Sequence, residues 1–203
     1  MSYRPLTRPD LPADTEALAR YLIGKVVVRA LPDGVASGRI VETEAYVVGD
    51  AAGHAYRGLT PRNRTLFLAA GQAYIYLAYG TSWMLNVSSE AAGTGAGVLI
   101  RALEPLDGVG LMQQNRGTAR LRDLLRGPGR LTQALGIDRS CDGLDLCQEG
   151  PLWLAQDDHA GGDIGQSVRI GLTKEADRRL RFFRLGNPFV SGPSWLNVAA
   201  AAD

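Results

Sequence analysis

The chain has 203 residues, 45% of them hydrophobic and 21% charged, with a formal net charge of +1. This length and composition predict a globular protein with a buried core, and we treat residues 1–203 as one domain. No apolar run approaches the roughly 20 residues that span a membrane. The 25 glycines and 10 prolines favour many turns over a bundle of long helices.

The positive charge is almost all arginine, because the lysines are limited to Lys25 and Lys174. Arginine suits phosphate and base edges, although a GC-rich coding sequence explains the bias equally well. Cys141 and Cys147 match no redox or zinc spacing, so we expect free thiols, a reducing compartment and no metal or other cofactor. The N-terminus lacks the apolar region of a signal peptide. We therefore expect a soluble intracellular protein, cytoplasmic and nucleoid-associated if it is bacterial.

The first part of the chain predicts a helix followed by a hairpin. Apolar residues at helical spacing indicate a helix over 14–23, and Gly24 follows its end. The β-branched run at 25–30 predicts a strand. Leu-Pro-Asp-Gly at 31–34 is typical of a turn, and 35–46 predicts the returning strand.

The rest of the chain predicts more hairpins and short helices. A polar, glycine-rich stretch at 50–64 is expected to be irregular. The remaining expectations are strands at 73–79, 83–88 and 98–103, helical material at 106–125 broken by Gly117, a helix at 131–137, late strands at 167–172 and 180–185, and a frayed tail at 197–203. The fold class is therefore α+β, with a mainly antiparallel curved sheet built from hairpins, flanking helices and a protruding β-hairpin.

Two carboxylates lie close together on the second expected strand. Glu42 and Glu44 have the same parity and therefore share a face, and Tyr46 shares it too. Two ordinary carboxylates on a solvated strand face explain the spacing at least as well as a catalytic pair does.

The next segments carry candidate binding residues. His54 lies among small residues, where its ring could meet a ligand or simply face solvent. Arg62 and Arg64 flank an asparagine after a proline, which suits phosphate contacts or a capped turn. Tyr79 lies at a hairpin tip before Gly80, and exposed wedges of this kind unstack a DNA duplex.

Other polar residues have both a structural and a functional interpretation. Tyr74 and Tyr76 share a strand face and could fill a core, and Asn86 and Arg101 could be core polar groups bonded to backbone. Gly127-Pro128-Gly129-Arg130 precedes a helix and presents free backbone N–H groups, which suits an anion or a plain helix entry. Arg130 is thus a third candidate for DNA-backbone contact.

Several strings in this order closely resemble the alkyladenine (3-methyladenine, methylpurine) DNA glycosylase family, from about Leu18 to Val190. The strings are RIVETEAY, TPRNR, the Y-x-Y-x-x-Y-G…N hairpin, VLIRALEP and GPGRLTQALGI. The resemblance implies an enzyme of base excision repair that responds to alkylation damage. It implies a double-stranded DNA partner that contains a damaged purine, no membrane association and a monomer.

The resemblance assigns the reaction centre to three residues. Glu44 matches the glutamate that activates the attacking water. Arg101 matches an arginine that helps to hold that water, and the backbone carbonyl of Ile170 matches a third water contact.

The resemblance also assigns the base and DNA contacts. Tyr46 and His54 match residues that lie against the extruded base, with Tyr76 as their stacking partner. Asn86 matches the residue beneath the base that clashes with the exocyclic amine of guanine. Tyr79 matches the side chain that fills the gap in the duplex. Thr81 and Ser82 depart from the bulky residues of many relatives and put the depth of this wedge in doubt.

The chemistry explains these residue types. The N-glycosidic carbon is unreachable inside a duplex, so the nucleotide must be flipped out, and aromatic stacking offsets that cost. A π-rich cage favours a cationic alkylated purine. A carboxylate stabilises the developing oxocarbenium ion and deprotonates water, and a nearby arginine would lower the pKa of Glu44. No lysine lies in 39–105 to act as a Schiff-base nucleophile, so we expect a monofunctional enzyme.

Two other functions fit parts of the pattern. A non-catalytic module that binds damaged DNA would share the aromatic and arginine residues, but the pairing of Glu44 with Arg101 argues against it. A hydrolase of nucleosides or small glycosides would have no need for Tyr79 at a hairpin tip.

Overall fold

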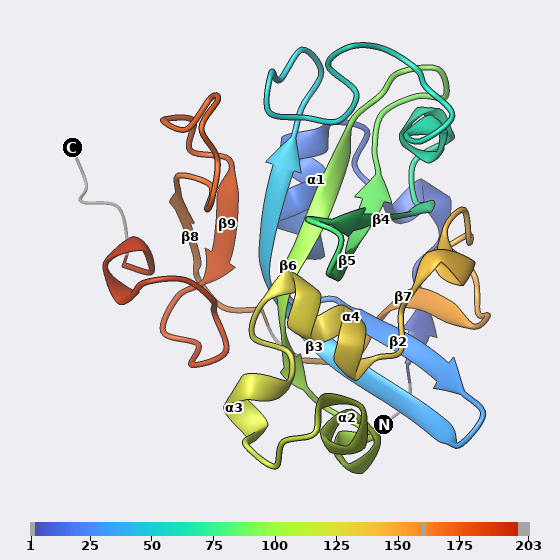
Figure 1. Cartoon of the computed structure of the whole chain (residues 1–203), viewed down its shortest axis with the longest axis vertical. Coiled ribbons are helices and arrows are strands. Elements are labelled where there is room, and N and C mark those ends of the chain that lie inside the picture. The colour runs from blue at the N-terminus through green and yellow to red at the C-terminus, as the bar shows by residue number, and fades with distance from the viewer. Residues whose placement is uncertain (1–2, 160, 199–203) are drawn as a thin grey trace.

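The computed structural model describes residues 3–159 and 161–198 and shows an α+β fold around one antiparallel sheet (Figure 1). Within that part of the chain the sheet has nine strands, seven of them in the order β1-β7-β2-β3-β6-β5-β4, with β9 on β3 and β8 on β9. The strands are β1 Arg4–Pro5, β2 Val26–Leu31, β3 Gly34–Tyr46, β4 Ala73–Ala78, β5 Ser82–Ser88, β6 Gly97–Pro105, β7 Leu152–Gln156, β8 Ile164–Ser167 and β9 Arg181–Arg184. The α-helices are α1 Thr15–Leu22, α2 Val109–Arg116, α3 Leu121–Leu124 and α4 Pro128–Ala134, and short 3₁₀ turns are η1 Arg8–Asp10, η2 Arg64–Phe67, η3 Arg139–Cys141 and η4 Ser194–Leu196.

The long strand β3 is the centre of the sheet. One edge pairs with β6 along most of its length, while the other edge pairs first with β2, over 34–39, and then with β9, over 42–44. The sheet therefore divides at the middle of β3, and β8 and β9 diverge from the direction of β2 and β7 (Figure 1). This division brings a late segment of the chain against Glu42 and Glu44.

A bulge interrupts the pairing of β3 with β6 at the same place. The register passes from Ile40 opposite Leu103 to Glu42 opposite Ala102, and then to Thr43 opposite Ile100. Val41 on one strand and Arg101 on the other consequently lack a register partner. Bulges of this kind redirect side chains and are common beside active sites.

The helix α1 is built as its sequence predicts. The Asp14 side chain accepts a hydrogen bond of 2.8 Å from the Ala17 backbone N–H, which caps the first turn. Leu18, Ala19 and Leu22 are fully buried on the face that packs on the sheet. The main core continues from this helix across the inner sheet face to α2 and α4.

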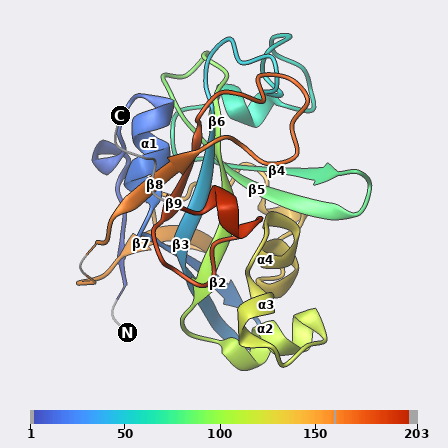
Figure 2. The same ribbon diagram turned by 90° about the vertical axis from the view of Figure 1, so that its left-hand side faces the viewer.

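The β4–β5 hairpin protrudes from the body of the protein (Figure 2). Its register closes with Ala78 opposite Ser82, which leaves a three-residue tip of Tyr79, Gly80 and Thr81. Tyr79 and Gly80 have φ angles of 51° and 70°, in the left-handed region. This conformation is unusual for a tyrosine, because its Cβ crowds the backbone there.

Most of the expected elements are confirmed, with four differences. The strand expected at 167–172 is wrong: β8 ends at Ser167, and the chain then leaves the sheet because Arg169 turns inward to contact Asp50 and the Ala45 carbonyl. The strands β1 and β7 were not predicted. The last helix begins at Pro128 rather than 131, because proline suits the first turn. Of the tail expected to fray, 199–203 lie outside the described residues.

Two further observations concern the cysteines and the helices. Cys141 and Cys147 are both free thiols, as expected. No helix in residues 3–159 or 161–198 is long and apolar enough to cross a membrane.

Gly108 provides a test of the packing between α2 and β3. It has a φ of 75°, and a Cβ added there would lie 2.5 Å from the Val35 carbonyl oxygen. Gly108→Ala should lower the free energy of unfolding by more than about 1 kcal/mol, because both strain and contact are unfavourable. Gly110 lies inside α2 with open space around it, so Gly110→Ala should raise stability by roughly 0.5–1 kcal/mol. Urea unfolding of both variants makes the comparison, and equal effects would contradict it.

Candidate active site

A cavity of about 320 Å³ opens beside the protruding hairpin. It lies between the 47–58 loop, the hairpin and the end of β3, and its volume falls in the range of small-molecule sites. Tyr46, His54, Tyr76 and Asn86 all line it, as do Arg62 and Tyr79 at the hairpin side. The tertiary structure therefore brings together the five residues predicted to contact the base or the gap in the duplex, along with Arg62, which was predicted to contact the DNA backbone.

Three aromatic rings form one wall of this cavity. The His54 and Tyr76 ring centroids are 4.3 Å apart, and Tyr74 stacks on Tyr76 at 5.5 Å. The His54 Nδ1 atom lies 2.9 Å from the Tyr74 hydroxyl. His54 keeps a solvent-exposed edge, but the partial burial of its ring, together with the charge of Arg62, lowers its pKa. A neutral imidazole at neutral pH follows.

Tyr46 also lines the cavity, and its ring is supported by Arg169. The Arg169 guanidinium lies 4.7 Å from the centre of its ring and contacts both carboxylate oxygens of Asp50. The side chains of Arg169 and Asp50 are both fully buried. Neither residue was singled out from the sequence, because Arg169 lies more than 100 residues from the strand that it supports.

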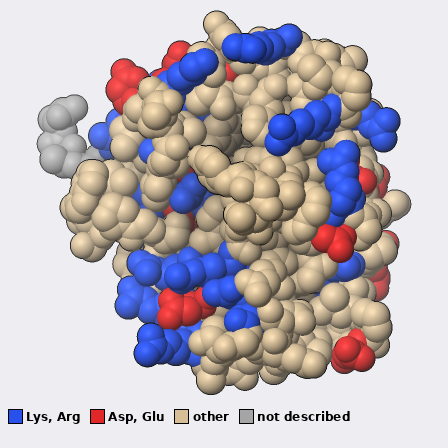
Figure 3. Space-filling view, in the orientation of Figure 1, with Lys and Arg blue, Asp and Glu red and all other residues tan. Residues whose placement is uncertain are grey.

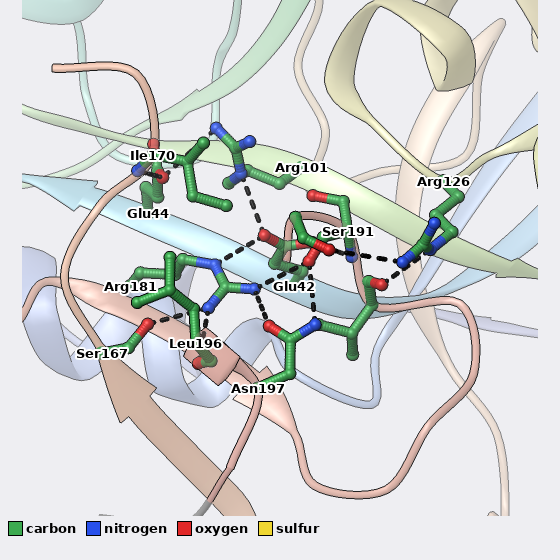
Figure 4. Close-up of polar contacts among 12 residues, drawn as sticks. Glu42, Glu44, Arg101, Arg126, Ser167, Ile170, Arg181, Ser191, Leu196 and Asn197 are labelled. Carbon is green, nitrogen blue, oxygen red and sulfur yellow. Dashed lines mark hydrogen bonds and ion pairs between the residues drawn. The ribbon is translucent and has the colours of Figure 1, made fainter. Parts of the chain in front are cut away.

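Glu44 does not line the cavity itself. It lies behind Tyr46, which lines the cavity and donates a hydrogen bond to Glu44. Its side chain is fully buried, and its Oε2 atom accepts from the Tyr46 hydroxyl at 3.0 Å. Its Oε1 atom accepts from the Ile170 backbone N–H at 2.7 Å and is 3.2 Å from the Arg101 Nη1 atom (Figure 4). The three residues assigned to the reaction centre therefore meet in space. The Ile170 contact seen here is made by its N–H, whereas the prediction concerned its carbonyl.

Glu42 is buried beside Glu44 but has a different environment. Its carboxylate accepts from Arg101, Arg181 and the Ser191 backbone N–H at 3.0, 2.7 and 2.7 Å. The solvated strand face considered above is therefore wrong for both carboxylates, because neither exposes any surface. Glu42 and Glu44 share Arg101, as their common parity predicts.

The pKa values of the two carboxyl groups move in opposite directions. Burial alone would raise the pKa of Glu42, but Arg101, Arg181 and Ser191 together hold it below its ordinary value. Burial raises the pKa of Glu44, and Arg101, Ile170 and Tyr46 do not offset this fully. Arg101 lowers the pKa of Glu44, as expected, but the effect of burial is larger and the net shift is upward. Two carboxyl groups with pKa values pushed apart are typical of a fixed anion beside a proton-accepting one.

Asn86 and Tyr79 occupy contrasting positions at the cavity. Asn86 is buried and donates 3.1 Å to the Tyr74 backbone carbonyl while it lines the cavity. It is therefore both bonded to backbone and available to a ligand. Tyr79 is 94% exposed, so its ring covers nothing in the protein itself.

The other proposed DNA-backbone residues lie outside the cavity. Arg64 is exposed at the start of η2, and Arg130 is exposed on α4, where it pairs with Asp123 at 2.9 Å. Basic side chains gather over α3 and α4 with few acidic ones between them (Figure 3). Ser82 packs against Gly129, where an added Cβ would lie 2.8 Å from the Ser82 Cβ. The small residue after the wedge thus lets α4 approach the hairpin.

Lys174 is a further residue that the sequence did not place near the site. It lines a second cavity of about 250 Å³ on the far side of His54, together with Arg57 and Arg62. In the part of the chain that the structure describes, no group of three or more His, Cys, Asp or Glu side chains is arranged to hold a metal ion.

Comparison with known proteins agrees with this arrangement. The family model for methylpurine-DNA glycosylase (MPG) matches residues 10–188. A protein of Mesorhizobium japonicum named "Putative 3-methyladenine DNA glycosylase" is 71% identical, over 93% of this chain and 91% of the relative. Proteins of the same name from Paraburkholderia phytofirmans and Chlorobaculum parvum are 53% and 47% identical, over 96% and 88% of this chain and 91% and 87% of the relatives.

The family match and the similarity over most of the chain together identify the class of protein. The chain belongs to the methylpurine-DNA glycosylase family. It is a DNA glycosylase, a hydrolase that acts in DNA repair.

The hydrogen bond that the Tyr46 hydroxyl donates to Glu44 lowers the pKa of the Glu44 carboxyl group, and a substitution can test this. The hydroxyl favours the charged carboxylate, so Tyr46→Phe should raise the pKa of Glu44 further. Titration of ¹³C-labelled glutamate by NMR, with Glu44→Gln to assign the signal, measures this. Tyr74→Phe is the matched control, because that hydroxyl contacts His54 instead. An unchanged or lower pKa in Tyr46→Phe would contradict the prediction.

Proposed function

We propose that this enzyme removes alkylated and deaminated purines from duplex DNA by flipping the nucleotide out and hydrolysing its N-glycosidic bond, which leaves an abasic site. The substrate class includes 3-methyladenine, 7-methylguanine, hypoxanthine and ethenoadenine. The enzyme acts as a monomer. The observation that carries the proposal is the buried Glu44 carboxylate, held by Arg101 and Ile170 directly behind a cavity lined by aromatic rings.

Tyr79 opens the duplex. Its ring is 94% exposed at the tip of a hairpin beside the cavity, and its left-handed backbone is a strained conformation, which proteins retain mainly at functional sites. An aromatic wedge of this kind occupies the space of the extruded nucleotide. Arg62, Arg64 and Arg130 contact the phosphates, and an arginine fork suits this role.

The cavity holds the extruded base between Tyr46 on one side and His54 with Tyr76 on the other. Stacking is worth roughly 1–3 kcal/mol per base and offsets much of the cost of extrusion. The rings also attract a cationic alkylated purine. Asn86 lies at the cavity surface with its amide fixed by the Tyr74 carbonyl, which suits a residue that rejects the exocyclic amine of guanine. The 3-methyladenine in the names of the relatives supports a methylated purine as substrate.

Glu44 activates the water that attacks the sugar. The Oε1 atom accepts from the Ile170 N–H and is paired with the Arg101 guanidinium, whereas Oε2 accepts from Tyr46 and has a second lone pair for a water. Its raised pKa makes it a better proton acceptor than an ordinary carboxylate, provided that it is ionised. The adjacent charge stabilises the oxocarbenium ion that develops on the sugar. Water is thus the nucleophile, and no lyase step follows.

Glu44→Gln separates binding from chemistry. It should bind duplex DNA with a hypoxanthine or ethenoadenine base as the wild type does, while single-turnover excision falls by about 10²–10⁴-fold. Gel-shift titration and base release measure the two effects, and borohydride should trap no covalent adduct with the wild type. Base release by the variant near the wild-type rate would refute the proposed mechanism. Faster hydrolysis of free nucleosides than of duplex would refute the substrate.

Tyr79→Ala tests the wedge. Loss of the ring should reduce extrusion by roughly 5- to 150-fold, since stacking contributes about 1–3 kcal/mol. The fluorescence of 2-aminopurine placed beside the lesion reports extrusion directly. Trp195→Ala is the control, because Trp195 is an aromatic residue with 71% exposure on η4. Equal fluorescence changes for Tyr79→Ala and the wild type would exclude this role.

A further inference from the structure

Glu42 is a buried anion to which the proposed reaction assigns no role. It exposes no surface, and its Oε1 atom accepts from both the Arg101 Nε and the Arg181 Nε atoms, at 3.0 and 2.7 Å. Its Oε2 atom accepts from the Ser191 backbone N–H at 2.7 Å. A buried carboxylate with three donors remains ionised, in agreement with its lowered pKa.

The geometry of Arg101 depends on Glu42. Arg101 lies at the β6 bulge, where the regular sheet register does not direct its side chain. A guanidinium is planar and rigid, so a bond at Nε fixes the direction of the other N–H groups. With Nε held by Glu42, the Nη1 atom lies 3.2 Å from Glu44, and the side chain keeps 10% of its surface exposed (Figure 4).

Arg181 anchors Glu42 from the opposite side. It is fully buried on β9 and donates to the Ser167 hydroxyl, to the Ser191 and Leu196 carbonyls and to the Asn197 side chain, at 2.8, 3.1, 3.2 and 2.6 Å. Figure 4 shows the 191–197 segment closing over Glu42 from this side. Glu42 therefore joins the catalytic strand to a segment almost 150 residues further along the chain.

We propose that Glu42 is a positioning residue for base excision, which fixes the Arg101 guanidinium against Glu44 and is itself held in place by Arg181 and the 191–197 segment. This inference rests on the proposed role of Glu44. Glu42 contacts neither base nor sugar, and it acts through Arg101.

The pH dependence of excision should report this arrangement. The charged and titratable groups that face Glu44 are Glu42 and Tyr46 from β3, Arg101 from β6 and Tyr76 from β4, and the 168–172 loop contributes the Ile170 N–H. Arg181 from β9 faces Glu42. Because Glu44 must be ionised to act as a base, its raised pKa places the acid limb of the wild-type profile above that of an ordinary glutamate.

Two substitutions of Glu42 separate the effect of its hydrogen bonds from the effect of its charge. Glu42→Ala removes every acceptor, so plateau single-turnover excision of hypoxanthine from duplex should fall by about 10²-fold. Glu42→Gln keeps one oxygen acceptor but no charge, so excision should fall less. The acid limb of the pH–rate profile of this variant should move to lower pH. The charge of Arg101 then acts on Glu44 alone and lowers its pKa further. Binding to a duplex with an uncleavable abasic analogue should stay within about threefold of the wild type for both.

Asp157→Asn is the matched control. Asp157 pairs with Arg39, another β3 residue, at 2.7 and 2.9 Å, and both side chains are largely buried. This variant should lose stability, as the Glu42 variants do, yet keep the wild-type plateau rate and acid limb. Rates are measured below the melting temperature of each variant.

The outcomes distinguish this inference from the proposed function. If Glu44→Gln is inactive but Glu42→Gln keeps the wild-type acid limb, or folded Glu42→Ala keeps the wild-type rate, the positioning role is wrong and Glu44 remains the base. If Glu44→Gln excises normally, the proposed mechanism itself is wrong. In the wild type, an NMR signal of Glu42 that titrates together with the acid limb would also overturn the inference.

Discussion

The structure depends on one constraint, which is that the buried carboxylates of β3 must each find cationic partners. An unpaired buried charge is strongly destabilising. Arg101 satisfies part of this need for both Glu42 and Glu44, and Arg181 supplies the rest for Glu42. Three features of the fold make these contacts possible. They are the bulge between β3 and β6, the pairing of β9 with β3 and the closure of the 191–197 segment over Glu42. The fold around the site is therefore organised by charge compensation as well as by apolar burial.

The charges of the two carboxylates are compensated to different degrees, and their pKa values differ as a result. Glu42 has enough donors to remain an anion, whereas Glu44 is left with a raised pKa beside the cavity. A fully compensated carboxylate would be a poor base, and an uncompensated one would be protonated. A second unfavourable feature, the left-handed backbone of Tyr79, lies at the same face of the molecule. The left-handed backbone of Tyr79 and the raised pKa of Glu44 thus occur at, or directly behind, the same cavity, and unfavourable features of this kind are common at functional sites.

Local patterns predicted much of the fold. The helix over 14–23, the β2–β3 hairpin and the protruding hairpin follow from periodicity and turn residues, which act over a few positions. The strand β7 was missed, although its apolar run Leu152–Gln156 after Pro151 is a signal of a buried strand. The wrong strand at 167–172 has a different cause. There the apolar alternation is real, but the inward turn of Arg169 toward Asp50 removes the segment from the sheet.

The sequence by itself determined the first helix and the longer strands of the first half, but not β1. It also determined the residue types of the site, because both depend on short segments such as 39–46. Only the tertiary structure decided how those residues act. The sequence does not say that Arg101 sits at a bulge, that Arg169 supports Tyr46 or that Glu44 lies behind the cavity wall. These facts depend on contacts between segments 60 to 150 residues apart. Burial, which reverses the expected shift of the Glu44 pKa, is likewise a property of the packed molecule and not of any local pattern.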